Sequence, residues 1–114
     1  MVDRPPRVAP RSSPLFLYVC EDGPDGARLR AERLADHLAY VEARFERYVA
    51  AGPLRSDADG APCASFFLIE AEDEADADAL MSGDPYMASG LYASVRRWRA
   101  TAAAGSLLGG VIWP

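Results

Sequence analysis

The sequence predicts one α+β domain in which a four-stranded antiparallel sheet carries two helices on one face. Residues 15–20 and 64–69 are short runs of mainly apolar and aromatic residues, as in buried strands. Between residues 27 and 51, apolar residues recur at three- and four-residue spacing, which indicates a helix buried along one side. With a second helix and two further strands, the order becomes strand–helix–strand–strand–helix–strand. Right-handed crossovers make this order a ferredoxin-like fold.

The first half of the domain contains the first strand and the longer helix. Pro14 precedes the strand, and the turn at residues 22–26, rich in glycine and aspartate, leads into the helix. The Gly52-Pro53 pair is expected to end that helix, because neither residue continues a helix well. The helix residues expected in the core are Leu34, Leu38, Val41, Phe45 and Val49.

The second half contains the remaining strands and the second helix. Residues 53–56 and 64–69 are expected to form a hairpin around the Asp-Ala-Asp-Gly tip at 57–60. The acidic run that starts at Glu70 is expected to open a helix that ends near Met81, since carboxylates stabilise the N-terminus of a helix. The remaining elements are a turn or helical bend at Asp84-Pro85-Tyr86, closed by Gly90, and a last strand over 91–99.

The strand over 64–69 is apolar on both faces, because Phe66 and Leu68 alternate with Phe67 and Ile69. A sheet face that met water would be polar. We therefore expect the face without helices to pack on a second copy of the chain in a two-fold homodimer.

Two segments fall outside the predicted domain of residues 15–99. Residues 1–14 contain four prolines interleaved with arginines, so they cannot form a helix or a central strand and are expected to be a flexible tail. Residues 100–114 are rich in alanine and glycine and end in an apolar stretch, and we expect them to pack on the domain or on the dimer partner.

Composition argues against several classes of function. The net charge of −5 disfavours nucleic acid as a partner. All 12 basic residues are arginine, so no lysine can serve as a nucleophile or form a Schiff base. No apolar run approaches the ~18 residues needed to cross a bilayer, and no secretory signal is recognisable. The expectation is a cytoplasmic protein without a membrane partner.

The two cysteines, Cys20 and Cys63, are too few for a zinc ligand set even with the one histidine. Neither a metal nor another cofactor is therefore expected. The cysteines lie at the same end of neighbouring predicted strands, where a disulfide is geometrically conceivable but not expected in a reducing cytosol.

His37 is the only histidine of the chain, and histidine is the side chain best suited to move protons near neutral pH. The predicted chain direction brings it to one end of the sheet. Ser65, near the start of the third strand, and Asp84, just before the fourth, are expected at that same end. These three residues are the first candidates for a site.

On the predicted helix, Arg33, Tyr40 and Arg44 share the side of His37. Such a cluster is typical of a pocket wall that binds a polar or anionic small molecule. The alternative is that a backbone carbonyl satisfies the imidazole and the arginines are solvated. Asp84 also has two interpretations, either as a carboxylate that orients the imidazole or as a turn starter and helix cap before proline.

A wider pattern adds to this local evidence. In order, the sequence contains Arg33-x-x-x-His37-Leu-x-Tyr40, Ala51-Gly-Pro-Leu54, Ser65-Phe-Phe-Leu-Ile69, Asp84-Pro-Tyr86 and Gly90-Leu91. Over residues 15–99 this pattern resembles the YciI-like (YCII-related) family of the dimeric α+β barrel superfamily. The resemblance implies a ferredoxin-like homodimer with a His–Asp active site, which maps onto His37 and Asp84. Ser65 falls where the family commonly has a Gly-Ser pair, with Ala64 in place of the glycine. A dehydrochlorinase acting on a chlorinated hydroxyquinol belongs to the family, and the superfamily includes muconolactone isomerases.

The leading hypothesis is a cofactor-independent enzyme that abstracts or relocates a proton on a small cyclic oxygenated compound. His37 is the expected general base, Asp84 its orienting partner, and Arg33 or Tyr40 the group that holds a developing enolate-type oxyanion. The expected substrate-binding residues are Arg33, Tyr40, Ser65 and Tyr86.

This hypothesis requires a ring nitrogen of His37 within ~3 Å of an Asp84 carboxylate oxygen. Two alternatives stay open. The first is a non-catalytic dimeric domain that binds a small ligand or has an accessory role. The second is a cofactorless monooxygenase of the same superfamily.

Overall fold

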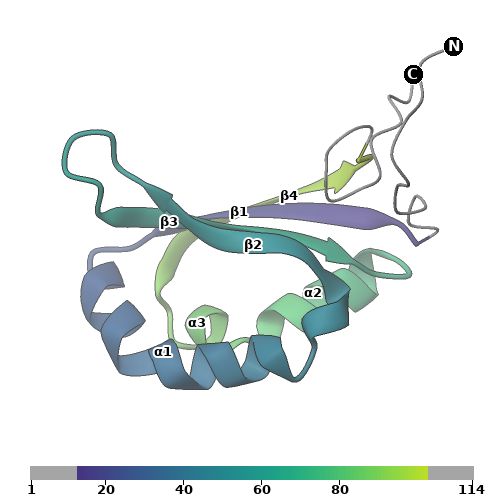
Figure 1. Ribbon diagram of the computed structural model, residues 1–114, viewed down its shortest axis with the longest axis horizontal. Coiled ribbons are helices and arrows are strands. Elements are labelled where there is room, and N and C mark those ends of the chain that lie inside the picture. Colours follow the sequence, from purple (N-terminus) through teal and green to yellow (C-terminus); the bar gives the residue numbers. More distant parts are fainter. Residues whose placement is uncertain (1–12, 103–114) are drawn as a thin grey trace, which may run out of the picture.

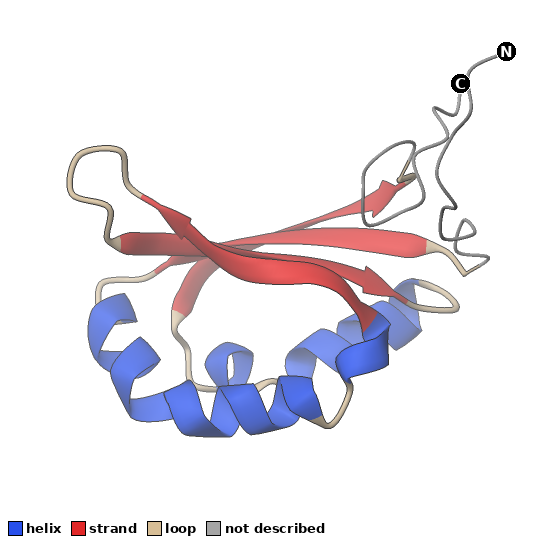
Figure 2. Ribbon diagram, in the orientation of Figure 1, coloured by secondary structure: helices blue, strands red, loops and turns tan. Residues whose placement is uncertain are grey.

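The computed structural model describes residues 13–102. Within this range a four-stranded antiparallel sheet carries the helices on one face (Figures 1 and 2). The strand order is β2-β3-β1-β4. The elements are β1 (Leu15–Asp22), α1 (Gly26–Glu42), a 3₁₀ turn (Phe45–Arg47), β2 (Tyr48–Arg55), β3 (Pro62–Glu70), α2 (Glu74–Ser82), α3 (Pro85–Ala88) and β4 (Tyr92–Ala100). The predicted ferredoxin-like α+β fold is confirmed, and the bend expected at residue 84 is followed by the short helix α3.

The core lies between the sheet and the helices. Alternate residues of the central strand β1, namely Phe16, Tyr18 and Cys20, are almost fully buried on the helix side. Phe67 and Ile69 of β3 lie opposite Tyr18 and Phe16 in the antiparallel register and complete this layer. Helix α2 covers it with Ala77, Leu80 and Met81.

Helix α1 is shorter than predicted. It ends at Glu42, not near residue 51, and the chain enters β2 at Tyr48, which pairs with Ile69 of β3. The spacing between Phe45 and Val49 imitates a helical repeat, but long-range pairing with β3 decides the structure of this segment. Strand β2 runs through Pro53, which is tolerated because β2 lies at the edge of the sheet.

The apolar stripe predicted for the core of α1 is wrong in most of its members. Leu34, Leu38 and Phe45 are 47%, 54% and 68% exposed. The buried residues of α1 are Gly26 and Leu29, both near its N-terminus. Helix α1 therefore turns a partly polar face toward the rest of the domain.

Helix α2 begins at Glu74, later than the predicted start at Glu70, because β3 continues through Glu70. The Asp73 side chain caps α2 by accepting a hydrogen bond from the backbone N–H of Asp76, at 2.8 Å. The acidic run is thus divided between the end of a strand, a loop and the first turn of a helix.

The other face of the sheet carries the second apolar layer that the sequence predicts. Phe66 pairs with Val19, and Leu68 with Leu17, and all four are only partly buried. Trp98 lies beside Leu17 on β4 and is 42% exposed. No helix in the described range covers this face (Figure 2).

The tails predicted at residues 1–14 and 100–114 lie outside the described residues, apart from 13–14 and 100–102. Between residues 13 and 102, none of the helices is long and apolar enough to pass through a lipid bilayer.

Candidate active site

A cavity of about 600 Å³ lies between α1 and the strands β2 and β3, on the helix side of the sheet. Its apolar lining includes Leu34, Leu38 and Val41 of α1 together with Pro53 and Phe67 of the sheet. Its polar lining consists of Arg30, His37, Arg55, Ser65 and Tyr86. A concave, mostly apolar space with a few polar groups is typical of a small-molecule site.

His37 and Asp84 are joined by hydrogen bonds at this cavity. The Nδ1 atom of His37 lies 2.8 Å and 2.9 Å from the two carboxylate oxygens of Asp84. The Asp84 side chain is 1% exposed and that of His37 is 13% exposed. A carboxylate accepts hydrogen bonds, so the neutral ring carries its hydrogen on Nδ1 and leaves a lone pair on Nε2.

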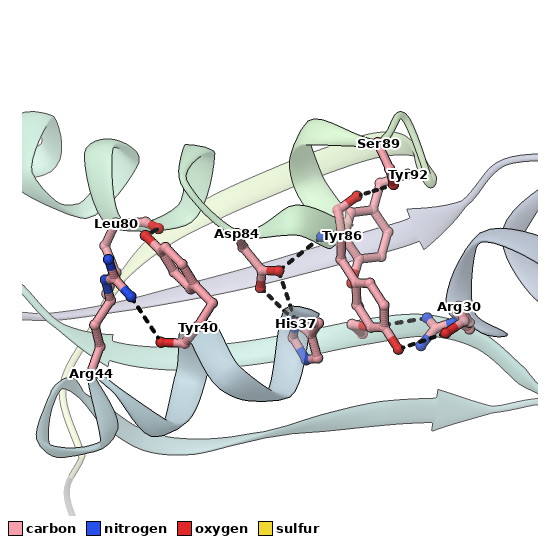
Figure 3. Close-up of polar contacts among 10 residues, drawn as sticks. Arg30, His37, Tyr40, Arg44, Leu80, Asp84, Tyr86, Ser89 and Tyr92 are labelled. Carbon is pink, nitrogen blue, oxygen red and sulfur yellow. Dashed lines mark hydrogen bonds and ion pairs between the residues drawn. The ribbon is translucent and has the colours of Figure 1, made fainter. Parts of the chain in front are cut away.

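Asp84 also caps α3, as expected of an aspartate before proline. Its Oδ1 accepts a hydrogen bond from the backbone N–H of Tyr86 at 2.9 Å, and Pro85 occupies the first turn of α3. The short helix carries the Tyr86 ring onto the imidazole of His37, with ring centroids 3.9 Å apart and planes 4° apart (Figure 3). Within this Asp-Pro-Tyr segment, Asp84 therefore contacts the edge of the imidazole at Nδ1, and Tyr86 packs on its face.

Ser65 lies at the polar end of the cavity in a second network. Its hydroxyl accepts hydrogen bonds from Arg30 Nη2 and from the Tyr92 hydroxyl, both at 2.9 Å. Arg30 in turn forms a two-point ion pair with Asp22, from Nε at 2.8 Å and from Nη2 at 2.7 Å. The hydrogen bond to Asp22 raises the pKa of Arg30, and burial raises the pKa of Tyr92.

Of this second network, only Ser65 was predicted from the sequence. Arg30 precedes His37 by seven residues, which is two helical turns, so their shared side of α1 was readable from the sequence. Asp22 gives no local signal beyond that of a turn residue. Tyr92 gives none either, because its contact with Ser65 depends on the sheet.

The structure does not bring the other predicted side chains to the cavity. Tyr40 donates its hydroxyl hydrogen to the backbone oxygen of Leu80 at 2.6 Å, and the Arg44 guanidinium stacks 3.7 Å above its ring (Figure 3). Gly83 leaves room for this hydroxyl, since a Cβ there would collide with it. Arg33 is exposed on α1 and does not line the cavity. Tyr40 therefore ties α1 to α2.

Neither cysteine is paired. Cys20 is buried beside Ser65 on the neighbouring strand, and Cys63 is exposed. Burial, with the nearby carboxylates of Asp84 and Asp22, raises the pKa of the Cys20 thiol to about 12. Among residues 13–102, no three His, Cys, Asp or Glu side chains cluster in a way that could hold a metal ion.

Comparison with known proteins assigns the family. Residues 15–101 match the family model of the YCII-related domain. The chain belongs to this family. A search of curated proteins finds no match.

Several solved structures are similar to this YCII-related protein. One is 5-chloro-2-hydroxyhydroquinone dehydrochlorinase from Burkholderia phenoliruptrix AC1100, in complex with 2,5-dihydroxybenzoquinone. It is 28% identical with a TM-score of 0.71, over 80% of this chain and 95% of that chain. A protein of unknown function from Nitrosomonas europaea is 24% identical with a TM-score of 0.49, over 80% and 92% of the two chains. A protein from Pseudomonas aeruginosa is 16% identical with a TM-score of 0.49, over 82% and 97%.

Proposed function

We propose that this YCII-related protein is a cofactor-independent enzyme that removes a proton from a small cyclic oxygenated compound. His37 is the general base, and Asp84 orients its ring. The reaction is an isomerisation or an elimination, such as the loss of hydrogen chloride. Tyr86 and Ser65 belong to the substrate-binding wall of the same cavity.

The observation that carries this proposal is the position of the imidazole. Nδ1 of His37 is held by a buried carboxylate, and the ring lines a cavity large enough for a substituted six-membered ring. An oriented imidazole with its second nitrogen available can accept a proton from a bound molecule, and such general-base catalysis contributes about 10²- to 10⁴-fold to a rate. The carboxylate also stabilises the imidazolium that forms.

The similarity to the dehydrochlorinase supports an elimination. That protein is named for the removal of hydrogen chloride from a chlorinated hydroxyhydroquinone and binds a dihydroxybenzoquinone. In such a reaction a base takes a proton, the electron pair of the broken bond forms a new double bond, and chloride leaves. His37 and the cavity supply a base and an apolar wall for this chemistry in our chain.

The working unit of the proposal is a homodimer formed through the open face of the sheet. Phe66, Leu68, Leu17 and Val19 make that face apolar in the centre. Covering it with the same face of a second copy removes this apolar surface from water, which stabilises the dimer.

The test measures chloride release from 5-chloro-2-hydroxyhydroquinone by the wild type and by the His37→Gln variant. The expected result is wild-type turnover and a loss of about 10²- to 10⁴-fold in kcat for the variant. Asp36→Asn is the matched control, because Asp36 is exposed on the same helix outside the cavity lining.

Chloride release that His37→Gln leaves unchanged would contradict the assignment of the base. If the wild type binds the compound without turnover, the alternative of a non-catalytic ligand-binding domain is favoured, because the cavity alone explains binding. Oxygen uptake during turnover would favour the cofactorless monooxygenase.

A further inference from the structure

The hydroxyl of Ser65 is held in one hydrogen-bonding state by its neighbours. Ser65 is 3% exposed, and its oxygen receives one hydrogen from Arg30 and one from Tyr92, each across 2.9 Å. A hydroxyl oxygen has two lone pairs, so both acceptor positions are in use. The one capacity left to Ser65 is to donate its own hydrogen.

The direction of the bond between the two hydroxyls follows from what each can reach. Only one hydrogen can lie between Tyr92 and Ser65. The Tyr92 hydroxyl makes no other hydrogen bond within residues 13–102, and Tyr92 does not line the cavity, whereas Ser65 does. Both hydroxyl hydrogens find an acceptor when Tyr92 donates to Ser65 and Ser65 donates to an acceptor on a molecule in the cavity.

Arg30 is itself fixed as a donor. Its two-point ion pair with Asp22 holds the guanidinium, and their side chains are 14% and 10% exposed. Gly26 at the start of α1 makes this approach possible, since a Cβ there would lie 2.5 Å from an Asp22 oxygen. A charged donor that bonds to a hydroxyl oxygen polarises the hydroxyl, so Ser65 becomes a stronger donor.

We propose that Ser65 donates a hydrogen bond to a carbonyl oxygen of the substrate, and that Asp22, Arg30 and Tyr92 are its positioning residues. This inference rests on the proposed function and identifies the substrate class as a neutral cyclic carbonyl compound. His37 Nε2 takes a proton from a carbon or oxygen conjugated with the carbonyl. The electron pair of the broken bond moves onto the carbonyl oxygen, and the enolate oxygen then receives a stronger hydrogen bond from Ser65.

Charge at the polar end of the cavity favours a neutral compound over a carboxylate. The Arg55 guanidinium of the lining bonds to the backbone oxygen of Gly60 in the loop after β2, away from the Ser65 hydroxyl's own partners. Around Ser65 and His37, Asp22 and Arg30 compensate each other, and Asp84 adds one negative charge when the imidazole is neutral. A bound carboxylate would lie near this negative charge and would find one hydroxyl donor where it needs several. The rest of the molecule faces the apolar wall formed by Leu34 and Leu38.

The test uses two probes of equal size, acetophenone with one neutral carbonyl and benzoate with one carboxylate, titrated into ¹⁵N-labelled protein by NMR. The expected result is that acetophenone binds the wild type more tightly than benzoate does. Ser65→Ala should raise the dissociation constant of acetophenone about tenfold, as for the loss of one hydrogen bond. Ser94→Ala is the matched control, because Ser94 bonds to Glu21 on the other face of the sheet.

Three results overturn the inference. They are no binding of acetophenone to the wild type at millimolar concentration, tighter binding of benzoate than of acetophenone, and an unchanged acetophenone constant in Ser65→Ala.

The role of Arg30 is tested by a double-mutant cycle. Arg30→Met should weaken acetophenone binding in the wild type but not in Ser65→Ala, because Arg30 acts through the Ser65 hydroxyl. Additive losses would overturn the positioning role. If Arg30→Met does not fold, Tyr92→Phe takes its place in the cycle. It should raise the dissociation constant of acetophenone about threefold when Ser65 is present and leave it unchanged in Ser65→Ala. Arg28→Met is the control, since Arg28 pairs with Glu32 on the exposed side of α1.

These titrations need no turnover, so they separate the two proposals. If turnover depends on His37 but acetophenone binding does not depend on Ser65, the inference about the carbonyl is refuted and the proposed enzyme is not. Binding that depends on Ser65, without any turnover that depends on His37, refutes the enzyme and leaves the donor role of Ser65 in place.

Discussion

The two roles of Asp84 can be separated by replacing it with asparagine. Asparagine caps helices as well as aspartate does, so Asp84→Asn keeps an acceptor for the Tyr86 N–H and should destabilise the fold by about 1 kcal/mol. Asp84→Ala leaves two buried donors, His37 Nδ1–H and Tyr86 N–H, without an acceptor. Each orphaned donor costs about 1–3 kcal/mol, so a loss of roughly 3 kcal/mol or more is expected from urea unfolding.

The chemical effect of Asp84→Asn should be much larger than its effect on stability. If Oδ1 stays on the Tyr86 N–H, the amide nitrogen takes the position of the other oxygen, now 2.9 Å from His37 Nδ1. A ring hydrogen on Nδ1 would then face the amide N–H, donor against donor, although Oδ1 stays 2.8 Å away. We expect the amide to donate to Nδ1 and the ring hydrogen to move to Nε2, which then cannot accept a proton. Turnover should fall about 10²- to 10⁴-fold.

The tautomer can be observed without a substrate. The chain has a single histidine, so ¹⁵N NMR of an untagged protein reports on His37 alone. We expect the Nδ1–H form of the neutral ring in the wild type and the Nε2–H form in Asp84→Asn. Asp73→Asn is the control, because Asp73 caps the start of α2 whereas Asp84 follows the end of that helix. An Nδ1–H ring with full turnover in Asp84→Asn would refute the reasoning, as would a stability loss equal to that of Asp84→Ala.

Three further outcomes follow from burial. Tyr48→Phe should leave stability unchanged or raise it by up to about 1 kcal/mol, since the buried Tyr48 hydroxyl has no hydrogen-bond partner in the described range. Tyr18→Phe breaks a 2.6 Å hydrogen bond to Asp78 and should lower the free energy of unfolding in urea by about 1 kcal/mol. Equal losses would contradict this contrast. Iodoacetamide at pH 8 should label Cys63 in the native protein and Cys20 only after unfolding. The Cys20 thiol is buried, and with a pKa of about 12 only about one part in ten thousand of it is thiolate at that pH. Fast labelling of both cysteines in the native protein would contradict this expectation. Light scattering should show a wild-type dimer and a folded Phe66→Arg monomer, and a wild-type monomer would refute the dimer through the open sheet face.

The parts of the fold that the sequence predicts well are those that local pattern decides. Residues 15–20 and 64–69 are apolar runs that only a central position in the sheet can bury, and they become parts of β1 and β3. The end of α1 was mispredicted because the spacing of Val49 from Phe45 fits a helix as well as a strand. Pairing with β3 decides for the strand, and no local pattern carries that information.

The candidate site, like the fold, has one part that the sequence predicted and one part that it did not. His37 and Asp84 are 47 residues apart, and topology with a family resemblance was enough to expect them together. Arg30 was not predicted, although a seven-residue step before His37 keeps to one side of a helix as the steps to residues 33, 40 and 44 do. Tyr92 meets Ser65 only across the folded sheet, so its part in the network could not be inferred from spacing.

The most informative error concerns the apolar stripe of α1. Its periodicity was real, but Leu34 and Leu38 face a cavity and not the core. The helix is held by Leu29, which packs on Tyr86 and Leu91, and by polar contacts. His37 bonds to Asp84, and the backbone oxygen of Arg30 accepts a hydrogen bond from the Tyr86 hydroxyl.

Polar contacts of this kind position a helix without filling the space beside it, because a hydrogen bond acts between two atoms whereas apolar packing closes every gap. An amphipathic helix fixed on its polar side can therefore turn its apolar side to a ligand. In this chain contacts that hold α1 also orient His37, so the apolar wall of the cavity and the oriented imidazole have a common structural cause.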